Sequence, residues 1–427
     1  MSASDSASIA AGGTPSAGAW GLNALQCRVV ALCGLVAFLD GFDTQAIGPA
    51  AGAIAHTLHV PIAKFGGVFS ATQLGFLLGA MVFGALGDRF GRKRLLIAAT
   101  AVFAACSLGT ALAGSMPALL AFRFLAGLGL GGASPNLVSL ASEYAPPRRR
   151  AAIVTMLWAA VPFGGMAAAF SSAATLPTLG WRAIFFAGCA VPLGLAFALA
   201  RLLPESREAA GAGSAAVVEA PRKAPIRELF SGGRALPTAW LWLASFMTWT
   251  ALIVMAFWTP ALLQKAGLSP AAAAGILAFN NAGGVIGTVL LGAMLIRVRP
   301  HYALAAALAL AAIFVAAIGL TTHAPILLGA VAVLAGFFAS AAAGALLAVS
   351  AETYPADARS TGVGWALGVG RTGAVFGPVA AGLLVAGGWP VSRIYLVIGA
   401  PFLAASLFVV LLALSARAGQ LSPSTRP

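Results

Sequence analysis

The sequence predicts an all-α integral membrane protein with twelve transmembrane helices in two pseudo-symmetric six-helix bundles. Three observations predict this fold: the apolar composition, the number of long apolar stretches, and the distribution of basic residues among the loops. Hydrophobic residues make up 60% of the 427 residues and charged residues only 8%. A water-soluble domain covers itself with polar groups, which this chain lacks.

A membrane-spanning helix needs about 20 mostly apolar residues. Stretches of this kind are apolar on all sides rather than alternating, which predicts helices and not the strands of a β-barrel. They lie at 27–54, 65–86, 95–114, 118–141, 151–174, 182–203, 237–261, 271–296, 302–320, 325–350, 360–386 and 391–414.

Basic residues gather in alternate loops and give the chain a formal net charge of +14. They follow the second, fourth, sixth, eighth and tenth spans, whereas the opposite loops hold only Lys64, Arg182, Lys265 and Arg393. The positive-inside rule therefore predicts that both termini are cytoplasmic. Because the basic residues are divided among short loops at one membrane face, nucleic-acid binding is excluded as the explanation of the high charge.

The chain repeats itself weakly at an interval of about 209 residues. Glu143, Pro146 and Arg150 follow the fourth span, and an identically spaced Glu352, Pro355 and Arg359 follow the tenth. Parallel six-helix halves related by an axis along the membrane normal are one plan of secondary transporters. We expect a disordered cytoplasmic segment at 1–22, bundles at 23–203 and 237–414, a cytoplasmic linker at 204–236, and a cytoplasmic tail at 415–427.

Two carboxylates, Asp40 and Asp43, lie midway along the first span, and their spacing of three places them on one helix face. A charge at this depth costs at least about 2.5–3.5 kcal/mol on insertion scales, so such residues usually serve a function. We expect them to couple transport to protons by reversible protonation. The alternative is a structural role, in which they cap backbone or pair with a neighbouring helix.

Arg123 in the fourth span and Arg371 in the eleventh are intramembrane guanidinium groups, and each needs an anionic partner. We expect Arg123 to pair with the carboxylates of the first span. Arg371 is the candidate ligand of a substrate carboxylate, with a helix–helix ion pair as the alternative.

Polar and aromatic residues within the apolar spans are further candidates for substrate binding, although each alone is more often part of a packed core. The predicted substrate-binding set comprises Arg371, Asn136, Gln73, Trp158, Trp365, Phe163 and Asn280. The predicted charge network that gates the cytoplasmic side comprises Asp88, Arg89, Arg92, Arg123, Glu143, Arg150, Glu352 and Arg359. For Glu143 and Glu352, the alternative is a simple interfacial position near basic loops.

The sequence offers no candidate metal or catalytic residues. Cys27, Cys33, Cys106 and Cys189 form no CxxC pair and lie within or beside apolar spans, as small apolar residues do. The spans hold no nucleophile–base–orienter set, so we expect neither an enzyme nor a cofactor.

Five segments resemble a known transporter family. GALGDRFGRKR (84–94) and RFLAGLGLGG (123–132) resemble motifs of the major facilitator superfamily. Within it, DGFDTQAIG (40–48), the segment 127–150 and TGVGWALGVGRTGAVFGP (361–378) resemble the aromatic acid:proton symporters, which include 4-hydroxybenzoate and benzoate transporters. The likeness extends from about residue 25 to 415.

By this resemblance, the family's functional positions fall on charged residues already singled out. They are Asp40, Asp43, Asp88, Arg123, Glu143 and Arg371. One departure is the segment GAMLIRVRP (292–300), which lacks the acidic residue that many superfamily members carry there. The cytoplasmic contact of the second half is then weaker or depends on Glu352 and Asp357.

The expected function is proton-coupled uptake of an aromatic carboxylate by alternating access, by a monomer in the inner membrane of a bacterium. The expected partners are the small aromatic acid, protons and the lipid bilayer, with no nucleic acid and no cofactor besides the proton gradient. One alternative is a drug or other organic-anion:proton transporter of the same fold. The other is a membrane sensor derived from a transporter, for which neither terminus nor the linker supplies a signalling domain.

Overall fold

The structure is a computed structural model that describes residues 22–146, 149–204, 226–294, 300–355 and 357–421. The side chains of residues 88, 151, 291–294 and 416–421 also lie outside the description. Nearly all of the segment predicted to be disordered, 1–22, and most of the predicted linker, 204–236, therefore lie outside the described residues.

The described residues contain twelve helices that are long and apolar enough to cross a membrane, which confirms the predicted spans. Two short 3₁₀ helices, η1 (Ile62–Lys64) and η3 (Ile226–Leu229), precede α2 and α7. The twelve helices are α1 (Ala24–Thr57), α2 (Phe65–Phe90), α3 (Arg92–Leu112), α4 (Met116–Tyr144), α5 (Arg150–Thr175), α6 (Trp181–Leu202), α7 (Ala235–Lys265), α8 (Pro270–Met294), α9 (Pro300–Leu320), α10 (Pro325–Thr353), α11 (Arg359–Ala386) and α12 (Val391–Leu421).

The cytoplasmic tail was expected to begin at residue 415. The part of α12 that is apolar enough to cross a membrane ends at Ser415, and the helix continues to Leu421. The segment 415–421 contains no proline, and the first helix-breaking residue is Pro423. The helix α12 therefore extends beyond the apolar stretch 391–414 from which the span was predicted.

Local sequence determines where several helices begin. Asn23 caps α1 in a reciprocal pair with Gln26, because the Asn23 side chain accepts from the Gln26 N–H at 2.8 Å and Gln26 Oε1 accepts from the Asn23 N–H at 3.0 Å. The Ser115 hydroxyl accepts from the Ala118 N–H at the start of α4. Between α2 and α3, Gly91 has φ of +93°, a conformation that glycine adopts without strain.

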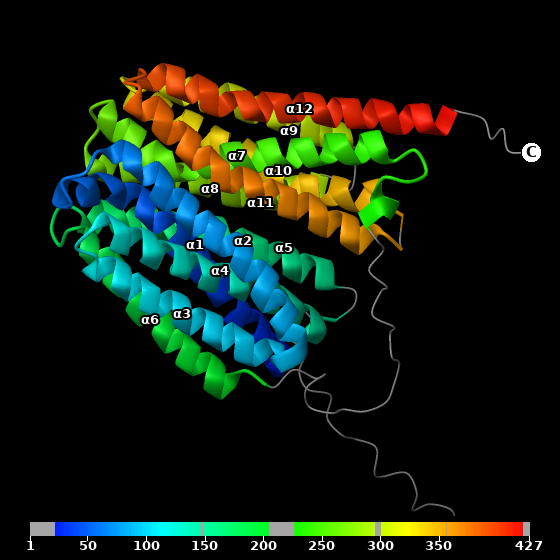
Figure 1. Cartoon of the computed structure of the whole chain (residues 1–427), viewed down its shortest axis with the longest axis horizontal. Helices are drawn as coiled ribbons and strands as arrows, with labels where there is room; N and C mark the ends of the chain where they lie inside the picture. Colours follow the sequence, from blue (N-terminus) through cyan, green and yellow to red (C-terminus); the bar gives the residue numbers. More distant parts are fainter. Residues whose placement is uncertain (1–21, 147–148, 205–225, 295–299, 356, 422–427) are drawn as a thin grey trace, which may run out of the picture.

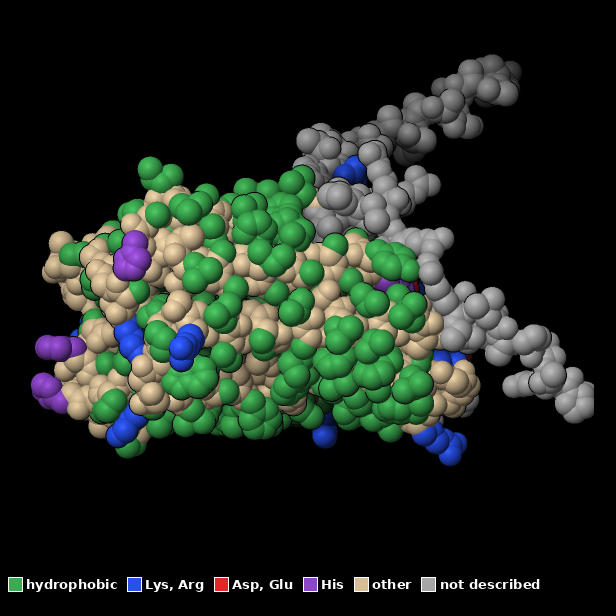
Figure 2. Space-filling view, turned by 90° about the horizontal axis from the view of Figure 1, so that it is seen from above, with side chains coloured by type: hydrophobic (Ala, Val, Ile, Leu, Met, Phe, Trp, Pro, Cys, Tyr) green, Lys and Arg blue, Asp and Glu red, His purple; other side chains and the backbone are tan. Residues whose placement is uncertain are grey.

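The helices form two bundles, α1–α6 and α7–α12, which lie side by side in Figure 1. They meet where α2 packs on α11, α5 on α8, and α1 on α7. Figure 2 shows apolar side chains over much of the lateral surface, with few basic groups between its two ends. This surface suits a lipid environment.

The two halves touch mainly at one end of the molecule. We name the end that carries the loops after α2, α4, α6, α8 and α10 the basic end, and the opposite end the distal end. In the distal part of the interface, the Phe69 ring of α2 lies 5.0 Å from Phe257 and 5.4 Å from Trp258 of α7. Nearby, the Ser70 hydroxyl donates to the Val375 carbonyl of α11 at 2.5 Å.

Candidate functional site

Asp43 of α1 lies in a buried ion pair with Arg123 of α4, the pairing expected from the sequence. Arg123 Nη1 is 3.2 Å from Asp43 Oδ2, and the two side chains are 0% and 1% exposed. The Ser107 hydroxyl of α3 donates to the same carboxylate at 2.9 Å, and Arg123 Nε donates to Thr110 Oγ1 at 3.1 Å. The guanidinium also lies over the Phe185 ring of α6. This carboxylate is therefore occupied in joining four helices of the first half.

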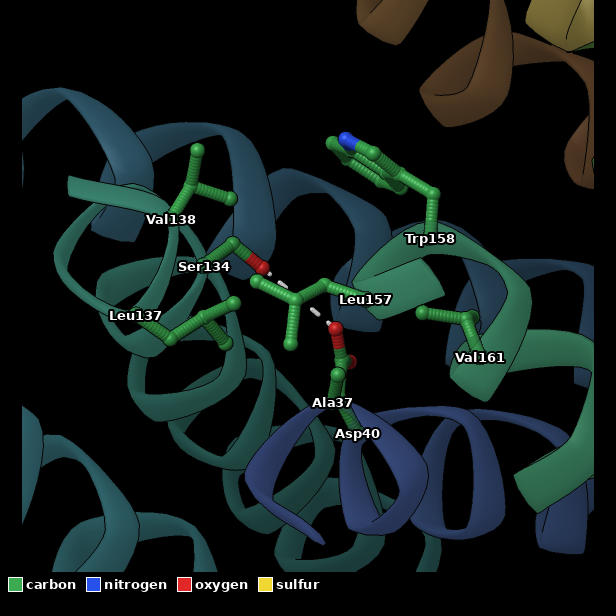
Figure 3. A pocket seen from close by; sticks show the side chains of 8 residues that line it. All are labelled: Ala37, Asp40, Ser134, Leu137, Val138, Leu157, Trp158 and Val161. Atoms are coloured by element: carbon green, nitrogen blue, oxygen red, sulfur yellow. Dashed lines mark hydrogen bonds between the residues drawn. The ribbon is translucent and has the colours of Figure 1, made fainter. Parts of the chain in front are cut away.

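Asp40, one turn earlier on α1, has different surroundings. Its carboxylate accepts hydrogen bonds from Thr44 Oγ1 at 3.2 Å and from Ser134 Oγ of α4 at 3.3 Å. No cation among the described residues forms an ion pair with it within 4.0 Å. Figure 3 shows Asp40 and Ser134 facing one another, with Trp158 of α5 above them.

A cavity of about 10 Å³ adjoins Asp40 and is lined by residues of α1, α4 and α5. This volume holds about one water molecule, and the Asp40 carboxylate and the Ser134 hydroxyl supply polar contacts for it. Asp40 is thus a carboxylate without a close cation, beside a space that water can enter. Such a group can take up and release a proton.

Arg371 of α11 is partly buried and lies against two aromatic rings. Its Cζ atom is 4.2 Å from the centroid of the Phe76 ring of α2 and 4.3 Å from that of the Trp249 ring of α7. Within the described part of the chain, no side chain or carbonyl accepts a hydrogen bond from its guanidinium. Asp40 is the charged group with which it interacts electrostatically. Arg371 is therefore a cation whose N–H donors have no hydrogen-bond acceptor among the described residues.

A cavity of about 490 Å³ opens in the half of the interface toward the basic end. It lies between α2 and α11 and is lined by Leu77, Met81, Ser360, Thr361, Gly364, Trp365, Gly368, Val369 and Thr372. The volume is within the usual range for small-molecule sites. The lining is mostly apolar. In the sequence, Arg371 stands between two of the lining residues, Val369 and Thr372.

The predicted aromatic residues lie at different places around these cavities. Trp158 lines the small cavity beside Asp40. Trp365 lines the large cavity and stacks on Trp242, with ring centroids 5.7 Å apart. Phe163 is 50% exposed and its ring lies 5.6 Å from that of Phe38.

The predicted amide side chains are not gathered around Arg371. Asn136 donates to the carbonyls of Phe83 and Gly132, which joins α4 to α2. Asn280 donates to the Ala332 carbonyl, which joins α8 to α10. These two amides therefore support helix packing. Gln73 is buried, and its Oε1 atom has no hydrogen-bond partner.

A reciprocal amide pair joins the two halves. Asn281 Nδ2 of α8 donates to Gln45 Oε1 of α1 at 2.8 Å, and Gln45 Nε2 donates to Asn281 Oδ1 at 3.2 Å. Both side chains are buried. Gln45, Ser134, Phe76 and Trp249 were not among the residues that the sequence predicted for the site. Only the three-dimensional arrangement brings these residues together, although Gln45 belongs to the motif 40–48.

The predicted cytoplasmic charge network is only partly assembled. Arg92 and Glu143 form an ion pair that joins α3 to the end of α4. Arg89 lies over the Phe90 ring, and the Asp88 side chain lies outside the described residues. In the part of the chain that is described, Arg150, Glu352 and Arg359 are exposed and form no ion pair. The same part contains no cluster of three or more metal-ligating side chains.

Two helical bundles around a central cation and a buried carboxylate define a membrane transporter. Comparison with known proteins supports this class. A sequence profile of the Major Facilitator Superfamily matches residues 33–332 and 276–426. The chain belongs to this superfamily and, within it, to the group of aromatic acid transporters.

Two relatives illustrate the group. The 3-(3-hydroxy-phenyl)propionate transporter of Escherichia coli K12 is 39% identical over 365 residues, which cover 84% of this chain and 86% of the relative. The 4-hydroxybenzoate transporter PcaK of Pseudomonas putida is 34% identical over 415 residues, with 91% and 93% coverage. The protein is therefore a multi-pass transporter of the bacterial inner membrane and not an enzyme.

Solved structures share the fold. A D-xylose-proton symporter matches with a TM-score of 0.75 and 19% identity, over 90% of this chain and 97% of that one. A bacterial homologue of the lysosomal transporter Spinster, in an inward-facing conformation, matches with a TM-score of 0.73 and 20% identity over 95% and 100%. The predicted twelve-helix fold is thus confirmed.

Proposed function

We propose that this protein takes up an aromatic carboxylate together with protons, by alternating access of a central site to the two membrane faces. Arg371 binds the substrate carboxylate, and Asp40 carries the proton. The proton gradient supplies the energy, and no cofactor takes part. The protein works as a monomer with both termini in the cytoplasm.

The observation that carries this proposal is that the buried part of the interface holds Arg371 without a hydrogen-bond acceptor among the described residues. Its guanidinium lies near the middle of α11, between the two halves, and within the described residues no acceptor occupies its N–H groups. A guanidinium at membrane depth needs an anion, and a carboxylate matches its paired donors. The names of the relatives, which transport aromatic acids, fit an anion of this class.

The proton assignment depends on the contrast between the two carboxylates of α1. Asp43 is held by Arg123, whereas Asp40 has only hydroxyl donors and a water-sized cavity. Asp40 also lies in the electrostatic field of Arg371. An anion that binds Arg371 offsets the charge that stabilises ionised Asp40, so binding of the substrate favours uptake of a proton.

Alternating access is supported by the unequal closure of the interface. Aromatic and hydrogen-bonded contacts join the halves toward the distal end, whereas the large cavity opens toward the basic end. With the basic loops in the cytoplasm, this arrangement corresponds to an inward-open state. Rocking of the two bundles would close this cavity and open the distal side.

The test of the anion site is binding of 4-hydroxybenzoate to the purified protein by isothermal titration calorimetry. Arg371→Ala should weaken binding by at least about 100-fold, because a charge-assisted bidentate contact contributes roughly 3 kcal/mol. Arg393→Ala removes an exposed arginine of α12 and should bind as the wild type does. Unchanged affinity in Arg371→Ala would place the anion site elsewhere.

The direction of flux separates this proposal from a drug:proton antiporter. Liposomes with an acidic exterior should accumulate 4-hydroxybenzoate when they contain the protein. Expulsion of substrate under this gradient would favour antiport, and binding without transport would favour a sensor.

A further inference from the structure

We infer that Phe76 and Trp249 are positioning residues that clamp the Arg371 guanidinium and leave only its edge for a carboxylate, so that the site selects planar anions. This inference rests on the proposed anion site at Arg371. It adds two specificity-determining residues, which act through the orientation of the arginine.

The clamp is built from three helices. Phe76 belongs to α2, Trp249 to α7 and Arg371 to α11, and both ring centroids lie within 4.3 Å of the guanidinium carbon. Contacts between a cation and an aromatic ring are effective within about 6 Å of the centroid. Phe76 is 6% exposed, so its ring is fixed by the surrounding packing.

The backbone of α11 is shaped to admit Trp249. A Cβ atom added at Gly370 would meet the Trp249 ring, with Cδ1 at 2.4 Å. The glycine beside Arg371 therefore allows the indole to approach the guanidinium. Gly370 thus has a specific role in this site.

The geometry restricts how an anion can approach. A guanidinium is planar, and its five N–H groups point outward in that plane. Two rings within 4.3 Å of the guanidinium carbon occupy space above the plane of the group, which favours approach of an anion along its edge. A carboxylate fits the edge because two coplanar oxygens meet two parallel N–H groups. A tetrahedral sulfonate has three oxygens and gains less from a fixed plane.

The clamp also spans the interface. Phe76 comes from the first half, whereas Trp249 and Arg371 come from the second. The orientation of the arginine therefore depends on how the halves are arranged. A ligand whose binding is strengthened by the clamp binds this arrangement of the halves more tightly than an arrangement in which Phe76 has moved away.

The test combines Trp249→Leu and Phe76→Leu with Arg371→Lys in the purified full chain, with benzoate and benzenesulfonate as probes in calorimetry. A lysine ammonium has no plane to orient, so it serves as the background in which a positioning role disappears. Trp240→Leu is the matched control, since Trp240 lies on the same helix and stacks on Phe408.

Trp249→Leu and Phe76→Leu should each weaken benzoate binding about tenfold, and Trp249→Phe should retain most of the affinity. In the Arg371→Lys background, the leucine substitutions should change the affinity less than about twofold. The preference for benzoate over benzenesulfonate should fall toward that of Arg371→Lys. Trp240→Leu should change neither quantity.

Three results would overturn the inference while the proposed function stands. The first is a loss in Trp249→Leu that persists fully in the lysine background. The second is an unchanged preference between the two anions, and the third is an Arg371→Lys variant that binds benzoate as well as the wild type does. Failure of the proposed function is a separate result, namely unchanged binding in Arg371→Ala.

Discussion

At the scale of single residues, two aspartates three positions apart on α1 have different environments. Asp43 is paired with a fully buried arginine, whereas Asp40 is bonded only to hydroxyl groups. The spacing of three places both on one face, and α4 contacts both, but Arg123 and Ser107 of α3 bind only Asp43. The structure therefore separates a structural carboxylate from one that is suited to proton transfer.

Asp43→Asn should destabilise the protein by about 3–5 kcal/mol, because it leaves the buried Arg123 charge without a partner. The measurement is the thermal unfolding temperature of the purified protein, which should fall. A second substitution, Arg123→Gln, should recover part of the loss. If Asp43→Asn unfolds at the wild-type temperature, the ion pair is not a determinant of stability.

Asp40→Asn should abolish accumulation of 4-hydroxybenzoate driven by a pH gradient, while its unfolding temperature stays close to that of the wild type. The substitution removes the proton site but keeps a side chain of similar size. Exchange of labelled for unlabelled substrate needs no net proton movement and should persist. Gradient-driven accumulation in this variant would show that another group carries the proton.

The role of single aromatic residues is the least predictable from the sequence. The spans are apolar on all sides, so Phe76 and Trp249 cannot be told from residues that pack in a core. Their function depends on meeting Arg371 from two other helices. The intramembrane charges were identifiable because their desolvation is costly wherever they lie.

At the scale of helices, glycines bring neighbouring backbones into contact. A Cβ atom added at Gly164 of α5 would collide with the Phe38 carbonyl of α1, and one added at Gly75 of α2 would collide with the Phe124 carbonyl of α4. Small residues permit this close packing in membranes, where the hydrophobic effect does not drive association.

Gly164→Ala should destabilise the protein by about 1–3 kcal/mol through overpacking against α1. Gly194→Ala on α6 is the control, since nothing lies within 4 Å of the added atom. This substitution should be neutral or stabilise the protein by up to about 1 kcal/mol. Thermal unfolding of both variants is the measurement, and equal effects would contradict the packing described here.

The Gln45–Asn281 pair links the two halves and should favour the state that is closed at the distal end. Gln45→Leu or Asn281→Leu alone leaves one amide buried without its partner, whereas the double substitution leaves neither. Spin labels at Thr178 and Ser269 report the separation of the halves at the distal end. Each single variant should shift the distance distribution toward longer values. Strictly additive effects in the double variant would argue against a direct pair.

At the scale of the whole molecule, the two halves share a plan but not the same charges. Arg92 and Glu143 pair in the first half, whereas the repeat-related Glu352 is exposed. The segment 292–300 also lacks an acidic residue. We therefore expect closure at the basic end to depend more on the first half than on the second.

Most of the architecture could be predicted from the sequence because a bilayer imposes strict requirements on length and polarity. The twelve spans and the Arg123–Asp43 contact were both expected. The amides Asn136 and Asn280 were expected at the substrate site, yet each joins two helices of one half. A single polar residue in an apolar span has several possible partners, and the sequence does not distinguish among them.

The central claim is that an anion bound at Arg371 moves together with a proton, and pH change inside liposomes measures this most directly. Proteoliposomes that contain a pH-sensitive dye receive 4-hydroxybenzoate from outside at a pH where the acid is ionised. We predict acidification of the interior by the wild-type protein, well above that of protein-free liposomes and of Asp40→Asn. Uptake of labelled substrate by the wild type without this acidification would contradict the account.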